Sequence, residues 1–71
     1  MNATAFQKLA MSFGLTFARD GGEFVVTGTP HATIEFLEAA LNSGATYLGN
    51  VSTFEPGGPA TTSARRFALA Q

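Results

Sequence analysis

The stretch from Thr29 to Gly44 constrains the fold of this 71-residue chain more than any other part of the sequence. Thr29 offers a side-chain oxygen to the free N–H groups of a first helical turn, and Pro30 suits the first helical position because its missing N–H has no partner there. Gly44 favours a stop, because a residue without Cβ closes a helix C-terminus at little cost. Between these ends an apolar stripe recurs at helical spacing opposite a polar one, the apolar residues being Ile34, Leu37, Ala40 and Leu41 and the polar ones His31, Glu35, Glu38 and Asn42. We therefore expect an amphipathic helix that needs a core to lie on.

A second helix is expected near the start of the chain, over residues 3–13. Its apolar side chains recur at positions i, i+3, i+4 and i+7, namely Phe6, Leu9, Ala10 and Phe13. Asn2 or Thr4 can cap its first turn, and Gly14 can end it.

The period of the pattern changes from helical to twofold at Leu15. Leu15 and Phe17 alternate with smaller residues, and Phe24 and Val26 alternate with polar ones after an interruption. The interruption contains Asp-Gly-Gly at positions 20–22, which supplies the positive φ angles of tight hairpin turns. The sequence predicts a β-hairpin here.

The last third of the chain predicts two more strands. Residues 46–54 have the β-branched and aromatic content of a strand, with Gly49 and Asn50 in the middle, which indicate either a bulge or a division into two shorter strands. Residues 55–62 are a loop by composition, rich in proline and glycine. Residues 63–69 favour a strand that pairs back across this loop, although a short terminal helix is the alternative.

These elements predict a single α+β domain over residues 1–71, in the order α-β-β-α-β-β, with both helices packed on one face of a small, antiparallel-rich sheet. The helix-facing side chains would be Leu15, Phe17, Phe24, Val26, Tyr47 or Leu48, Phe54, Phe67 and Leu69. By alternation, the opposite face would show Thr16, Ala18, Val25, Thr27, Thr53, Ala64 and Ala68. This second face carries few charges to keep other strands away, so we expect a partner or a second copy to cover it.

Composition narrows the class of protein. The chain has no cysteine, which excludes disulfides, thiolate metal sites and a cysteine nucleophile and disfavours an oxidising compartment as its location. Only 13% of the residues are charged, against about 25% in ordinary domains, and the net charge is −1. Strong polyanion binding is therefore disfavoured. No apolar run is long enough to span a membrane, and we expect a cytoplasmic protein.

Candidate catalytic and metal-binding residues are sparse. His31 is the only histidine, and Glu35 one turn later completes at best half of a metal site. Glu35 and Glu38 lie on one polar stripe of the same helix. A glycosidase-type pair of carboxylates instead faces a cleft from two different elements. The glycine pairs at 21–22 and 57–58 lack the spacing of a phosphate-binding loop. We expect no catalytic residues, no metal and no cofactor.

Arginines and aromatics are the better candidates for contact with a partner. Arg65 and Arg66 would lie on opposite faces of a strand, so they form no single basic patch for nucleic acid. Arginine beside an aromatic is, however, typical of protein-interface hot spots. Phe36 lies one residue off the apolar stripe and, like Tyr47, could anchor a partner. The predicted protein-binding residues are Ala18, Val25, Thr27, Phe36, Tyr47, Arg65 and Arg66.

The function that these observations favour is that of a small, non-enzymatic protein-binding module, acting sterically on a larger protein or protein complex or on its own copy. The size and the lysine-poor composition suit a phage or bacterial accessory protein that inhibits a host enzyme or defence complex. The alternative is a dimeric regulator associated with nucleic acid, whose binding would fall steeply with salt.

Overall fold

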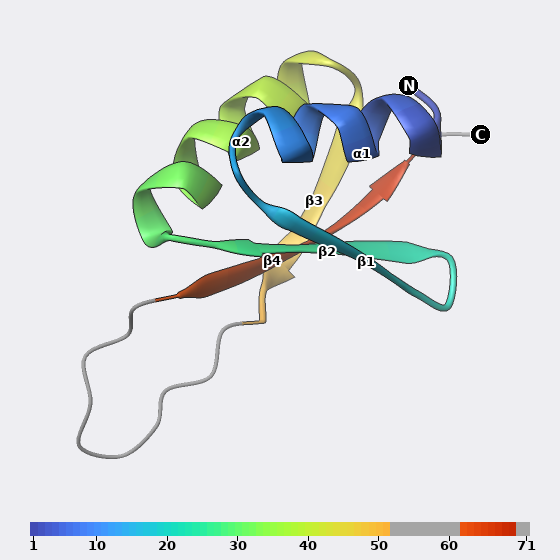
Figure 1. Ribbon diagram of the computed structural model, residues 1–71. Helices are drawn as coiled ribbons and strands as arrows, with labels where there is room; N and C mark the ends of the chain where they lie inside the picture. Colours follow the sequence, from blue (N-terminus) through green and yellow to red (C-terminus); the bar gives the residue numbers. More distant parts are fainter. Residues whose placement is uncertain (52–61, 70–71) are drawn as a thin grey trace.

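The computed structural model describes residues 1–51 and 62–69 and has the predicted order α-β-β-α-β-β (Figure 1). Its elements are α1 (Ala3–Ser12), β1 (Thr16–Asp20), β2 (Glu23–Gly28), α2 (Pro30–Asn42), β3 (Ala45–Asn50) and β4 (Ser63–Leu69). The α+β class is confirmed, and the segment 63–69 is a strand, which excludes the alternative of a terminal helix. The predicted loop up to residue 61 and the predicted strand residues Thr53 and Phe54 lie outside the described residues.

The four strands form one antiparallel sheet in the order β1-β2-β4-β3, and both helices lie on the same face of it (Figure 1). β1 and β2 form a hairpin. α2 then connects β2 to β3 at the far edge of the sheet, and β4 pairs with both β2 and β3 between them. The unit β2-α2-β3 is thus a βαβ unit split by β4. Both β1 and β3 are edge strands.

Local sequence signals account for the ends of most elements. The Asn2 side chain caps α1, since its Oδ1 accepts from the Ala5 N–H at 2.8 Å, and the Thr29 Oγ1 accepts from the Ala32 N–H at 3.2 Å at the start of α2. Gly21 and Gly22 have φ angles of 58° and 94°, which the two-residue hairpin turn requires. In the described part of the chain, no helix has the length and apolar character needed to cross a bilayer.

A cluster of phenylalanine rings joins the helices to the sheet. Phe6 of α1 is fully buried, and its ring centroid lies 5.3 to 5.8 Å from those of four others. These four come from the second helix and from three of the four strands, namely Phe17 of β1, Phe24 of β2, Phe36 of α2 and Phe67 of β4. Tilted and edge-to-face arrangements of this kind add to the energy of simple burial.

The buried face of α2 differs from the predicted stripe. Ile34 and Leu41 are 56% and 48% exposed, and Leu37 is only partly buried. The helix buries Phe36 and Thr33 together with Ala40, the one member of the predicted stripe that is fully buried, and the Thr33 hydroxyl donates to the Pro30 carbonyl at 2.9 Å. The reason is that one large ring reaching Phe6 and Phe67 buries more apolar area than two aliphatic side chains at the rim.

This rotation of α2 can be tested by two alanine substitutions. We expect Phe36→Ala to lower the free energy of unfolding by about 3–5 kcal/mol, because it leaves a cavity in the core. Ile34→Ala should change it by no more than about 0.5 kcal/mol, because the side chain is mainly exposed. Urea unfolding followed by far-UV circular dichroism measures both. A larger loss for Ile34→Ala than for Phe36→Ala would restore the stripe predicted from sequence.

Candidate protein-binding surface

The candidate surface is the face of the sheet opposite the two helices (Figure 1). Strand register places ten side chains on this open face, namely Thr16, Ala18, Asp20, Glu23, Val25, Thr27, Thr46, Ala64, Arg66 and Ala68. Six of the seven residues predicted for it are thereby placed as expected, and Thr53 lies outside the described residues. Four of the seven predicted protein-binding residues, Ala18, Val25, Thr27 and Arg66, therefore share one surface.

The charged residues of the open face lie together at the hairpin end. The Arg66 Nη1 donates to the Asp20 Oδ2 and to the Glu23 Oε1, both at 2.9 Å. These two hydrogen bonds, of which the one to Asp20 contributes more, raise the pKa of Arg66 above its ordinary value. Arg66 is thus compensated locally, and the other seven side chains of the face are Ala, Val and Thr. The sequence prediction of a nearly uncharged face is corrected at this end.

Arg65 points to the other side of the sheet, as alternation predicted. Its strand partner Val26 is fully buried under the helices, and its Nη1 donates to the Tyr47 hydroxyl at 2.8 Å. The guanidinium carbon lies 5.6 Å from the centroid of the Tyr47 ring, in cation–π geometry. Among residues 1–51 and 62–69, no carboxylate forms an ion pair with Arg65. Arg65 and Tyr47 thus form a half-buried pair beneath the helix layer, separate from the open face.

Phe36 also leaves the predicted surface. Its side chain is fully buried, and its ring packs edge-to-face against Phe6, Phe13 and Phe67. A residue in this position contributes to the stability of the core and presents no area to a partner. The prediction that Phe36 anchors a partner is therefore wrong.

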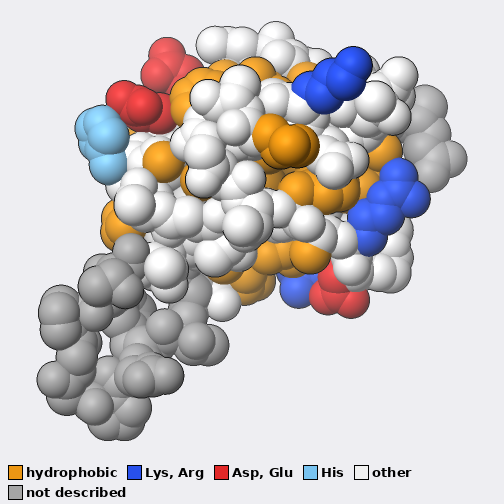
Figure 2. All heavy atoms as spheres, in the orientation of Figure 1, with side chains coloured by type: hydrophobic (Ala, Val, Ile, Leu, Met, Phe, Trp, Pro, Cys, Tyr) orange, Lys and Arg blue, Asp and Glu red, His pale blue; other side chains and the backbone are white. Residues whose placement is uncertain are grey.

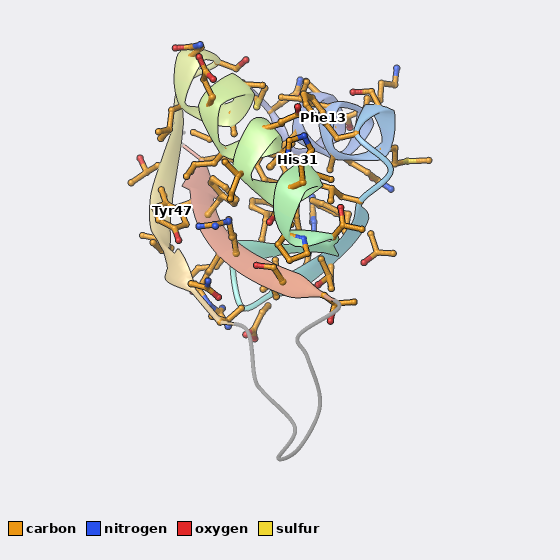
Figure 3. All side chains as sticks on the ribbon, turned by 90° about the vertical axis from the view of Figure 1, so that its left-hand side faces the viewer. Phe13, His31 and Tyr47 are labelled. Atoms are coloured by element: carbon orange, nitrogen blue, oxygen red, sulfur yellow. The ribbon has the colours of Figure 1, made fainter. Side chains whose placement is uncertain are left out.

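The only histidine forms a surface pair and no larger site. The His31 Nε2 lies 3.0 Å from the Glu35 Oε1 one helical turn away, and the two side chains are 86% and 56% exposed. Figure 3 shows His31 on α2 and Tyr47 on β3, at separate places on this side of the molecule. Within the described ranges, no three His, Asp or Glu side chains come together as metal ligands would.

Sequence reasoning missed a hollow between the start of α1 and the β1–β2 hairpin. Its volume is about 520 Å³, and its walls are Met1, Asn2, Ala3, Arg19, Gly22, Phe24 and Leu69. The Arg19 guanidinium covers the Phe24 ring at 5.4 Å from its centroid. The described residues of these walls include no histidine, carboxylate or hydroxyl, so they offer none of the usual side-chain acids, bases or nucleophiles.

Comparison with known proteins adds no assignment, because no protein-family model, no curated protein and no solved structure matches this chain. The arrangement of side chains is therefore the basis for the functional argument.

Because Arg65 and Arg66 lie on opposite faces, replacing each by alanine should affect Tyr47 differently. Tyr47 is the only tyrosine in a chain without tryptophan, so its fluorescence can be followed alone. Arg65→Ala should increase the quenching of Tyr47 fluorescence by acrylamide, because it uncovers the ring and removes the donor to its hydroxyl. Arg66→Ala is the matched control and should leave the quenching unchanged, because Arg66 lies on the opposite face. Equal quenching in both variants would contradict this placement.

Proposed function

We propose that this chain is a non-enzymatic protein-binding module that docks on a larger protein or protein complex through the open face. One observation carries the proposal: the helices cover one face of the sheet, while the other is left to small, mainly uncharged side chains. Antiparallel sheets that leave a face to water usually make it polar by alternation. Here four of the ten side chains, Ala18, Val25, Ala64 and Ala68, are apolar.

The chemistry of this face favours protein over nucleic acid as the partner. A sheet that binds single-stranded nucleic acid uses aromatic side chains on which bases stack, together with free cations along the backbone path. The ten side chains of the open face include no aromatic, and their single cation, Arg66, is already paired with Asp20 and Glu23. Arg65 cannot supplement Arg66, because it lies on the other side of the sheet.

The size of the face indicates how a partner would use it. Four strands of about five residues span roughly 300 Å², given the usual strand spacing and rise. A stable interface buries about 800 Å² on each partner, so the contact must extend beyond the sheet. Leu48 and Val51, at the β3 edge, are 45% and 37% exposed and could extend it. The mechanism implied is steric, in which the domain covers a surface of its partner and blocks access to it.

A charge placed on the open face tests this proposal. We expect Thr27→Glu and Ala68→Glu each to weaken binding at least about tenfold while the fold is kept, because the new carboxylate would lose its water in the complex without gaining a partner. Asn42→Glu adds the same charge at the exposed end of α2 and should bind like the unmodified protein.

The measurement starts with capture on the immobilised domain from a cell lysate, with and without nuclease, and with mass spectrometry of the bound material. The purified target is then titrated calorimetrically against the three variants. Binding that survives both open-face substitutions would show that the open face is not the binding surface. Capture that disappears with nuclease would shift the assignment to nucleic acid.

A further inference from the structure

The β1 edge of the sheet carries backbone groups that have no partner among the described residues. A two-residue turn makes its flanking residues, Asp20 and Glu23, a hydrogen-bonded pair, and such pairs alternate along an antiparallel ladder. Ala18 and Thr16 are therefore bonded to β2, whereas the N–H and C=O groups of Phe17 and Arg19 point outward. No backbone hydrogen bond between elements of the described chain uses these outward groups.

The two edges of the sheet differ in how they are protected. At β3 the register shifts between Tyr47 and Gly49, and Gly49 has a φ of 132°, so the edge is interrupted by a bulge. Bulges of this kind protect an edge against pairing with other strands. β1 pairs with β2 without interruption over all five residues and contains no proline, and its two charged residues, Arg19 and Asp20, lie at the hairpin end of the strand. Of the two edges, β1 is the one suited to add a strand.

We propose that β1 pairs antiparallel with β1 of a second copy of this chain, about a two-fold axis that passes between the two Ala18 residues. In this register, Phe17 lies opposite Arg19 of the second copy, and each such pair exchanges both of its backbone hydrogen bonds. Arg19 would then lie between its own Phe24 ring and Phe17 of the second copy. On the other face, Thr16 lies opposite Asp20 of the second copy, so no like charges meet.

The neighbouring two-fold registers are less favourable. An axis at Arg19 would place the two arginines directly opposite each other, which is destabilising. An axis at Phe17 would extend the pairing to Leu15, whose N–H already donates to the Ala10 carbonyl at 3.1 Å. The strand is therefore self-complementary only about Ala18.

The helix layer adds a second, independent observation. Met11 of α1 is 62% exposed, the highest value among the large hydrophobic side chains of the described residues. It lies two positions, or about 200° of helical rotation, from both Leu9 and Phe13, which pack on the core. Phe13 contacts Phe36 of α2, so Met11 lies on the flank of α1 that faces away from α2.

This flank belongs to the side of the molecule on which β1 is the sheet edge (Figure 1), and hydrophobic side chains are exposed there between α1 and β1 (Figure 2). Antiparallel pairing of β1 places its two-fold axis normal to the sheet, so the helices of both copies lie on one face. The α1 flanks then face each other above the new strand pair, and Met11 of each copy is covered. A net charge of −1 opposes the approach of two copies only weakly.

A single engineered cysteine tests the register, because the chain contains no other thiol. In Ala18→Cys the two thiols would lie in a non-hydrogen-bonded pair, with Cα atoms about 4.5 Å apart and within disulfide range. Thr16→Cys is the matched control on the same strand and face, and its thiols would lie about 13 Å apart along the strands. We expect mild oxidation to link Ala18→Cys into covalent dimers at least tenfold faster than Thr16→Cys, with the difference abolished in guanidinium chloride.

Sedimentation equilibrium of the unmodified protein should show dimers that Arg19→Pro weakens, because this change removes an outward N–H without breaking a bond to β2. Equal rates of cross-linking for the two cysteine variants, or a monomer at all concentrations up to millimolar, would overturn the proposal. The inference does not rest on the proposed function. Ala68→Glu, two strands away on β4, should leave the cross-linking of Ala18→Cys unchanged. Docking through the open face and pairing of β1 between two copies are therefore tested independently.

Discussion

The packing of Phe6 against four other phenylalanine rings is the interaction on which the rest of this structure depends. A chain of 71 residues without cysteine and with few charges has little besides apolar burial to stabilise it. Rings are an efficient solution, because each buries a large area at the cost of few rotatable bonds. Since one ring of α1 contacts β1, β2, α2 and β4, the helix layer and the sheet are fixed by a single cluster.

The described residues form their core on one side of the sheet only. The chain has only two helices in its described part, and both are used on the same face. The side chains left on the open face are too small to form a second core, and its charges are gathered at the hairpin end by Arg66, Asp20 and Glu23. Away from the hairpin end the face carries only Ala, Val and Thr side chains, and an uncharged surface of this kind is suited to contact with another protein surface.

Sequence reasoning succeeded where the signal was local. The Thr29 cap, the turn at Gly21 and Gly22 and the alternation in the hairpin depend on neighbouring residues, and the structure confirms them. The buried face of α2 was missed, because a helix with aliphatic residues on one side and Phe36 beside them can lie in two orientations, and only contacts with Phe6 and Phe67 decide between them. The ion pair of Arg66 was also beyond reach, because it joins residues 46 positions apart through the pairing of β2 with β4.

The position of β4 in the sheet has a consequence for biosynthesis. β4 is the last of the described elements in the chain, yet it lies between β2 and β3 and contributes Phe67 to the core. Until residues 63–69 leave the ribosome, the hairpin and β3 have no common neighbour, and Phe6 and Phe36 lack one of their contacts. We therefore expect the nascent chain to remain incompletely folded until this segment has left the ribosome, when β4 closes the sheet through contacts between residues distant in sequence.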